Sequence, residues 1–221
     1  MKRRNFKHIL SALMLMLLLT ACGSNDKPGT DKSAVNGNKE QKPYTVTDDL
    51  DKEITFEKVP ETVVSLQPSN TEILFALGDG GKVTGVTEYD YYPEEAKDIE
   101  RVSDSMTVNT EAVLSLDPDA VLAYTTGDEE NLKVLEDAGI PVFVIESASS
   151  IEDVYGDIGQ IAAVMGKEEK GEELIKNIKE QIQGVKDKTA TLSKQEKVYF
   201  EISPSPDIFT AGSDTFQQDL L

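Results

Sequence analysis

The sequence predicts an α/β fold in which a parallel sheet is covered by helices on both faces, a doubly wound arrangement. Short apolar runs rich in Val, Ile or Leu alternate with helix-like stretches along residues 62–146. Gly78 and Gly139 follow two of these stretches, where a helix C-terminus commonly has glycine. A charged amphipathic stretch at residues 168–192 then predicts one long helix, which would measure roughly 37 Å.

The elements of the predicted sheet follow one another in a regular order. YTVTDDLDKEITF, residues 44–56, reads as two short strands around an Asp-Asp turn. Four apolar runs are predicted as strands, at residues 62–66, 83–87, 120–125 and 142–146. Three periodic stretches between them are predicted as helices, at residues 70–77, 110–116 and 129–138. Strand and helix alternation of this kind favours parallel pairing.

Beyond residue 146 the alternation gives way to helical periodicity. A helix is predicted at residues 151–165, then a break at Gly166 and the long helix. The apolar residues of the long helix recur at spacings of three and four and form one stripe: Leu174, Ile175, Ile178, Ile182 and Val185. Residues 194–221 add a strand at 197–202 and a helix beginning at Ser213. These elements are too few to bury a core, so we expect them to be the start of an incomplete second α/β lobe.

The N-terminus has the features of a secretory signal over residues 1–21. A cationic stretch, MKRRNFKH, precedes the apolar run ILSALMLMLLL, which is shorter than the roughly 20 residues that a spanning helix needs. Leu19-Thr20-Ala21-Cys22 resembles a bacterial lipobox, and Cys22 is the only cysteine. We therefore expect lipidation at Cys22, attachment to the extracytoplasmic face of the cell membrane, and a flexible tether over residues 22–43.

Composition excludes several classes of function. The formal net charge is −19, and it becomes more negative when the basic residues of the signal are lost, so nucleic-acid binding is disfavoured. His8, the only histidine, is also lost with the signal. The mature chain then lacks the imidazole of a Ser-His-Asp or Cys-His site and of a histidine-ligated metal site. Catalysis by carboxylates alone, as in glycoside hydrolysis, stays open.

A polar turn separates the first strand of the predicted sheet from the helix that follows it. In VVSLQPSNTEILFALG, Ser69 and Glu72 form a capping-box pattern. That pattern predicts a helix N-terminus, with unpaired amide groups, at the carboxyl end of a parallel strand. In open α/β sheets, ligands bind at this edge.

Four segments together resemble one protein family. They are VVSLQPSNTEILFALG, VTGVTEYDYYPEEA, VNTEAVLSLDPDAVLAY and LEDAGIPVFVIE. In order and spacing they are similar to the periplasmic binding proteins for iron siderophores, haem and vitamin B12, and most similar to the vitamin B12 receptor branch. The resemblance covers residue 44 to the end. It implies a substrate-binding lipoprotein of an ABC importer, with two Rossmann-like lobes joined by a long helix.

The resemblance also implies a set of ligand-contacting residues. Pro68, Ser69 and Asn70 would line the cleft, and Tyr89 would place a ring against the ligand. Tyr124 stands where the vitamin B12 receptor carries a tryptophan. Aromatic faces suit large flat ligands such as a corrin, a porphyrin or a catecholate complex.

Three further residues, in or between these segments, qualify the resemblance. Ser105 replaces another tryptophan of the vitamin B12 receptor, which leaves the ligand open among cobalamin, haem and a ferric siderophore. Tyr91 and Tyr92 we expect to pack against the lobe. The loops carry no arginine cluster, which disfavours highly anionic citrate or catecholate siderophores.

Glu111 is the residue that the resemblance assigns to docking. In the family, a glutamate at this position on each lobe meets arginines of the permease subunits. A carboxylate in the first turn of a helix is also favoured by the helix dipole whatever its function. The partner glutamate of the second lobe would lie beyond Leu221.

The sequence therefore predicts a receptor without enzymatic activity, cofactor or metal of its own, acting as a monomer. It would consist of an N-terminal lobe at residues 44–166, an inter-lobe helix at 167–193 and the start of a C-terminal lobe at 194–221. Two alternatives stay open. One is a truncated remnant of such a receptor that folds without binding, and the other is a cell-surface hydrolase that uses two carboxylates.

Overall fold

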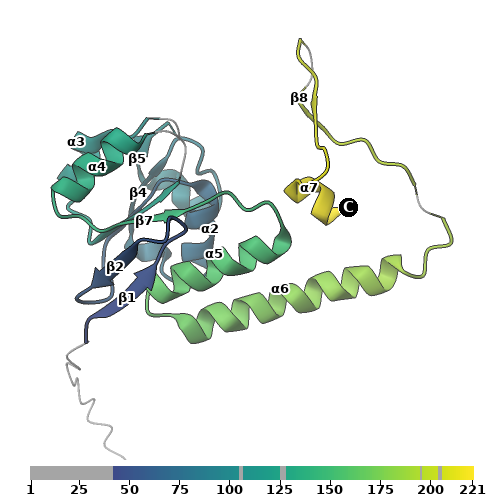
Figure 1. The fold of residues 1–221 in the computed structure, drawn as a ribbon, viewed down its shortest axis with the longest axis horizontal. Coiled ribbons are helices and arrows are strands. Elements are labelled where there is room, and N and C mark those ends of the chain that lie inside the picture. The colour runs from purple at the N-terminus through teal and green to yellow at the C-terminus, as the bar shows by residue number, and fades with distance from the viewer. Residues whose placement is uncertain (1–41, 105–106, 125–127, 195, 204–205) are drawn as a thin grey trace, which may run out of the picture. The chain divides into compact units, whose positions relative to one another are not determined.

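The computed structural model describes residues 42–104, 107–124, 128–194, 196–203 and 206–221 (Figure 1). The predicted signal, the lipidation site Cys22 and Ser105 lie outside these residues, as does the predicted tether up to residue 41. Within the described ranges, no helix combines the length and apolar character needed to cross a membrane.

An antiparallel hairpin opens the described chain, as predicted. Strand β1, Tyr44–Thr47, pairs with β2, Glu53–Phe56. The rings of Tyr44 and Phe56 stack with their centroids 5.5 Å apart. Asp48 fixes the turn, because its Oδ1 accepts hydrogen bonds from the backbone N–H groups of Leu50 and Lys52.

A five-stranded parallel sheet forms the centre of the fold, in the order β5-β4-β3-β6-β7. Its strands are β3 Val63–Ser65, β4 Val83–Thr87, β5 Glu100–Ser103, β6 Ala120–Tyr124 and β7 Val142–Ile145. The four predicted strands are confirmed. The fifth, β5, was not predicted: it is an edge strand whose first residue is exposed and whose second is only half-buried, so its apolar signal is short.

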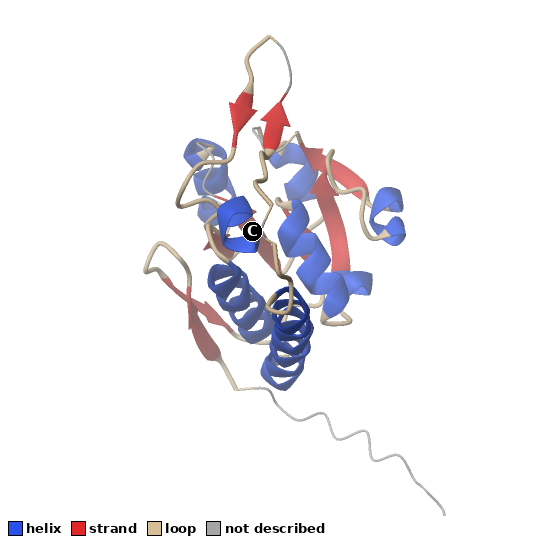
Figure 2. Cartoon of the chain, turned by 90° about the vertical axis from the view of Figure 1, so that its right-hand side faces the viewer, coloured by secondary structure: helices blue, strands red, loops and turns tan. Residues whose placement is uncertain are grey.

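Helices cover both faces of this sheet (Figure 2). They are α2 Pro68–Ala76, α3 Thr110–Ser115, α4 Glu129–Asp137, α5 Ile151–Val164 and α6 Glu168–Thr189. Short 3₁₀ turns occur at Gly80–Lys82 and Glu94–Asp98. Every predicted helix of this part of the chain is confirmed in type, and the long helix ends three residues earlier than expected.

Alternate residues of each strand enter different cores, because successive side chains of a strand point to opposite faces. Val63, Leu122 and Phe143 pack in one core with residues of α2 and α5. Val64, Val121 and Val144 pack in the other with residues of α3 and α4. The two cores confirm the doubly wound α/β fold.

The start of α2 differs from the prediction. The N-cap is Gln67 and Pro68 occupies the first helical turn, so Ser69 lies inside the helix and makes no capping hydrogen bond. The capping box of Ser69 and Glu72 is therefore wrong. Proline is well suited to the first turn, where a backbone N–H has no intrahelical partner.

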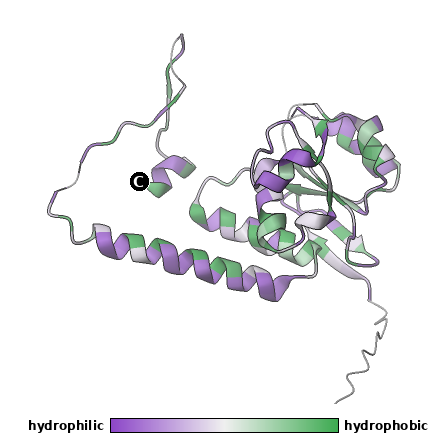
Figure 3. Ribbon diagram, turned by 180° about the vertical axis from the view of Figure 1, so that it is seen from behind, coloured by the Kyte–Doolittle hydropathy of each residue, from purple (hydrophilic) through white to green (hydrophobic). Residues whose placement is uncertain are grey.

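The long helix α6 lies alongside α5, with one apolar stripe on a polar surface (Figures 1 and 3). Leu174, Ile175 and Ile178 of that stripe pack against the core that contains residues of α2 and α5. Beyond it come β8 Glu201–Ser203, β9 Phe209–Thr210 and α7 Phe216–Leu220. None of the described residues from 196 onwards is buried, and Tyr199, Ile208 and Phe209 are exposed.

Truncation of a central core side chain tests this architecture. Leu122 of β6 is completely buried, so Leu122→Ala should lower the free energy of unfolding by about 2 to 5 kcal/mol. Leu114→Ala is the matched control, because Leu114 of α3 is 38% exposed and should cost far less. Urea unfolding monitored by circular dichroism measures both, and equal losses would contradict the described core.

Candidate functional site

The sheet reverses its strand order between β3 and β6. From β3 the chain proceeds to β4 and β5 on one side, and then continues through β6 and β7 on the other. Ligands of open α/β sheets bind outside the carboxyl ends of the strands at such a switch point. The segments at this edge are those that follow β3, β4, β6 and β7.

The turn after β3 supplies Pro68, Ser69 and Asn70. Ser69 is exposed and Pro68 is half-buried, whereas Asn70 is 1% exposed. The side-chain nitrogen of Asn70, Nδ2, is buried without a hydrogen-bond partner among the described residues. A buried donor without a partner is costly. The amide nitrogen of Asn70 is therefore one group of this edge whose hydrogen-bonding capacity is not used within the described part of the protein.

Tyr89 is held on a rigid loop after β4. Its backbone N–H donates to Thr87 Oγ1 at 3.1 Å. Asp90, completely buried, accepts at Oδ2 from the backbone N–H of Thr87 at 2.9 Å and from its hydroxyl at 2.6 Å. The ring of Tyr89 is nevertheless 56% exposed.

Arg101 of β5 completes this loop from the neighbouring strand. Its guanidinium donates to the backbone carbonyls of Thr87 at 2.9 Å and Asp90 at 3.1 Å. The loop is thus bonded on both sides of Tyr89. A side chain held this way can meet a ligand with little further loss of conformational entropy.

Tyr91 and Tyr92 do not pack against the lobe, and that expectation is wrong. They are 63% and 68% exposed. The buried residue of this loop is Asp90, whose carboxylate occupies the interior position, so the tyrosines on both sides of it face solvent. The loop thus presents three exposed aromatic rings where one was predicted.

Tyr124 ends β6, on the other side of β3 from Tyr89. Its side chain is half-buried, and its hydroxyl oxygen accepts a hydrogen bond from Ser147 Oγ at 2.6 Å. Strands β4 and β6 both neighbour β3, so the two tyrosines start from strands about 10 Å apart. The turn at Pro68 lies between them in strand order.

Glu111 lies in the first turn of α3, and its side chain is exposed. The N-cap of this helix is Asn109, whose side chain accepts a hydrogen bond from the backbone N–H of Ala112 at 3.1 Å. Helix α3 follows strand β5, so this N-terminus also starts from the carboxyl side of the sheet.

A second feature of this edge was missed from the sequence. A cavity of 460 Å³ lies between the turn after β1 and the segment from β7 into α5. Its lining includes Asp49, Glu146, Ser147, Ser149, Glu152, Asp153, Asp157 and Gln160. Asp157 is 9% exposed, and burial, followed by the charges of Asp49 and Asp153, raises its pKa to about 6. The described residues contain no cluster of three or more His, Cys, Asp or Glu side chains arranged to hold a metal ion.

The apolar stripe of α5 carried the signal for this cavity. Val154, Ile158 and Ile161 recur at helical spacing, and Asp157 occupies the same face, directly before Ile158. A carboxylate among buried apolar positions is an exception that calls for a reason.

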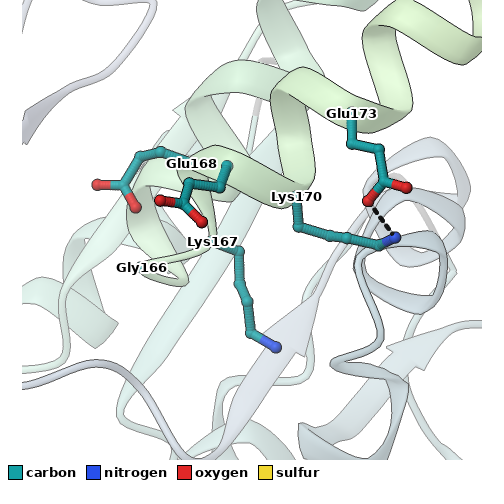
Figure 4. A pocket seen from close by; sticks show the side chains of 6 residues that line it. Gly166, Lys167, Glu168, Lys170 and Glu173 are labelled. Carbon is teal, nitrogen blue, oxygen red and sulfur yellow. Dashed lines mark hydrogen bonds and ion pairs between the residues drawn. The ribbon is translucent and has the colours of Figure 1, made fainter.

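A different hollow lies at the start of α6, lined by Gly166, Lys167 and neighbouring charged residues (Figure 4). Lys170 Nζ is 2.8 Å from Glu173 Oε2, and Lys167 lies 3.5 Å from buried Asp79. Asp79 leads into β4 at the amino end of that strand. This hollow therefore lies near the amino ends of the strands, away from the switch point at their carboxyl ends. Its lysines are already paired with Asp79 and Glu173.

The buried carboxyl of Asp157 makes a pH-dependent contribution to stability. Its folded pKa lies above the ordinary value of 3.8, so the contribution is fully present below about pH 4 and is lost as the pH rises through about 6. Asp157→Asn should therefore raise the free energy of unfolding by about 1 to 2 kcal/mol at pH 7.5 and have little effect at pH 4. Urea melts at both pH values test this, with exposed Glu173→Gln as the control. A gain of the same size at both pH values would contradict the assignment.

Comparison with known proteins identifies the family of this chain. The family model described as periplasmic binding protein matches residues 63–221. The uncharacterized ABC transporter substrate-binding lipoprotein YvrC of Bacillus subtilis is 42% identical over 220 residues, which cover 96% of this chain and 69% of the relative. The vitamin B12-binding protein of Vibrio campbellii is 32% identical, over 70% of this chain and 56% of that protein.

A solved structure agrees with the sequence relatives. The crystal structure of a possible iron-binding (periplasmic solute-binding) protein from Staphylococcus epidermidis is 33% identical, with a TM-score of 0.66, and the match covers 73% of this chain and 64% of that one. This chain thus spans between about half and about two thirds of the length of these relatives. It belongs to the periplasmic binding protein family.

Proposed function

We propose that this protein is the substrate-binding lipoprotein of an ABC importer that captures a metal chelate outside the membrane and delivers it to the permease. The chelate is cobalamin, haem or a ferric siderophore. The protein makes and breaks no covalent bond and acts as a monomer. Cys22 carries its lipid anchor on the extracytoplasmic face of the cell membrane.

The observation that carries this proposal is the exposed aromatic loop at the switch point. Exposed aromatic rings are costly to leave in water, and Tyr89 is held there by hydrogen bonds to its neighbours. Tyr124 approaches from the other side of β3, and Pro68, Ser69 and Asn70 lie between them. Rings presented on a rigid frame suit a large flat ligand better than a small polar one.

The organisation of the chain fits the same function. Residues 44–166 form the first ligand-binding lobe, residues 167–193 the connecting helix and residues 194–221 part of the second lobe. A ligand held between two lobes would contact both, so the edge of the described sheet supplies one wall of the site. The stiffness of a helix of this length would limit the travel of the lobes on closure.

The carboxylates of the acidic cavity do not favour the hydrolase alternative. Asp157 has a raised pKa, as a general acid would, but its neighbours are engaged in structural hydrogen bonds. Asp49 accepts from Glu146 N at 2.7 Å and from Gln160 Nε2 at 2.6 Å, and Asp153 accepts from the backbone of Ser149 and Ser150. A nucleophile or base with its oxygens so occupied is poorly placed to react.

The non-binding alternative makes the first experiment decisive. Thermal unfolding of the full chain in detergent would be measured with cobalamin, haem and several ferric siderophores in turn. A ligand at 100 times its Kd should stabilise the fold by about 2.7 kcal/mol, which a melt detects. A cooperative melt that no compound shifts would favour the non-binding alternative.

Tyr89→Ala identifies the aromatic contact within that experiment. It should weaken binding of the compound that shifts the melt by about tenfold or more, because one stacked ring face is lost. Tyr199→Ala is the matched control: Tyr199 is 64% exposed but follows α6 and belongs to no segment at the carboxyl ends of the five strands. Isothermal titration gives both Kd values, and unchanged affinity in Tyr89→Ala would remove this residue from the site.

Docking to the permease should depend on Glu111. Reversal of its charge, Glu111→Lys, should weaken association with permease subunits in nanodiscs by about tenfold, because it would meet arginines with like charge. Glu169→Lys is the control, since Glu169 is also an acidic residue in the first turn of a helix. Equal loss in both variants would mean that net charge, rather than this position, governs docking.

A further inference from the structure

The acidic cavity beside the switch point contains more acceptors than donors. Asp49, Glu146, Asp153 and Asp157 make no ion pair within the part of the chain that the structure describes. Glu152 is the exception, because its Oε1 lies 3.6 Å from Lys179 Nζ of α6. Four uncompensated carboxylates thus share a cavity of 460 Å³.

Two of the lining groups lack a partner although they are buried. Asp157 is 9% exposed and accepts no hydrogen bond from the residues described. Gln160 donates its Nε2 to Asp49 Oδ1 at 2.6 Å, which fixes the orientation of the amide, because the reverse would set two oxygens against each other. Its Oε1 is consequently buried without a donor. Both groups call for N–H donors.

A metal ion is a poor partner for these unpaired acceptors. No described group of three or more carboxylates is arranged as a metal site. Both oxygens of Asp49 already accept hydrogen bonds, and one oxygen of Asp153 accepts three. Among the buried acceptors of the cavity, only the Asp157 carboxylate and Gln160 Oε1 lack a hydrogen-bond donor from the described residues, too few for the six or more oxygens that calcium takes.

We propose that this cavity binds an alkylammonium group. An ammonium supplies three N–H donors and one positive charge. It would donate to the Asp157 carboxylate and to Gln160 Oε1, with Asp49, Asp153 and Glu146 contributing charge. The volume is sufficient for a short alkyl chain attached to the nitrogen.

The cavity adjoins the candidate ligand edge through one hydrogen bond. Ser147 lines the cavity, and its hydroxyl donates to Tyr124. The ammonium group can therefore come from two sources, a free amine or the charged arm of a chelate seated on the tyrosines. The chemistry at Asp157 is the same for both.

Binding depends on the ionisation of Asp157. The charged groups that face it are Asp49 from the turn after β1, Glu146 after β7, and Glu152 and Asp153 of α5, with Lys179 of α6 paired to Glu152. An alkylamine remains protonated across the pH range 5 to 8, whereas Asp157 takes up a proton below about pH 6. Affinity for the amine should fall about tenfold from pH 7.5 to pH 5.

The test uses 1,4-diaminobutane with the full chain in detergent at pH 7.5. At millimolar concentration it should raise Tm by about 3 °C or more, whereas 1,4-butanediol should not. Asp157→Asn should abolish the shift, and Asp157→Glu should retain part of it. Glu173→Gln, in the hollow at the start of α6, should respond as the unaltered chain does.

The outcomes separate the alternatives. A shift lost in Asp157→Asn and at pH 5 supports the site. No shift, or an equal shift in Asp157→Asn, overturns it, as does an equal shift with calcium or magnesium chloride. The source of the ammonium is identified with a ferric trihydroxamate that has a free ammonium arm, compared with its N-acetylated form. Tighter binding of the free-arm compound that is lost in Asp157→Asn supports the arm of a chelate. Binding of diaminobutane without such a preference supports a free amine. The diaminobutane test does not depend on the proposed transport function.

Discussion

The parallel pairing of β3 with β4 on one side and β6 on the other is the constraint on which the candidate site depends. It brings Val63 and Val64 into two different cores, so the position of β3 is fixed from both faces. A shift of one residue would exchange those faces and expose apolar side chains. The same pairing brings the segments after three strands to one edge, although they are far apart in the sequence. For that reason Tyr89 and Tyr124 follow the two strands that flank β3, on either side of the turn at Pro68.

Buried polar groups then hold the edge in shape. Asp90 stabilises the loop of Tyr89 from the inside, and Arg101 bonds the same backbone from β5. Asp48 and Asp49 play a comparable part for the hairpin, because their carboxylates accept from the backbone of Val144 and Glu146 around the end of β7. These two loops are therefore tied to strands other than their own, which favours a preformed surface over one that orders on binding.

Most of the sheet could be predicted from the sequence because its strands are continuous apolar runs, as strands buried on both faces are. Strand β5 could not, since Glu100 and Arg101 interrupt the apolar signal at the sheet edge. The Ser69 capping pattern failed because the helix begins two residues earlier, with Gln67 as the N-cap and Pro68 in the first turn. Tyr91 and Tyr92 were expected to pack against the lobe, whereas the loop buries Asp90 and leaves both rings exposed. Local periodicity could single out Asp157 on the apolar face of α5, but it could not predict the cavity, because Asp49 reaches it from more than a hundred residues away.

Charge at the edge bears on which chelate the proposed receptor would accept. The sequence has three arginines, of which Arg3 and Arg4 belong to the predicted signal, and the guanidinium of Arg101 is bonded to backbone carbonyls. Glu72 and the acidic cavity add negative charge to the same side, and burial, with the nearby Asp90, raises the pKa of Glu72. A ligand with several carboxylates would find no free guanidinium here and would be repelled by like charge. On physical grounds this wall of the site suits a neutral or cationic flat ligand, with the aromatic rings supplying contact area and the carboxylates selecting against anions.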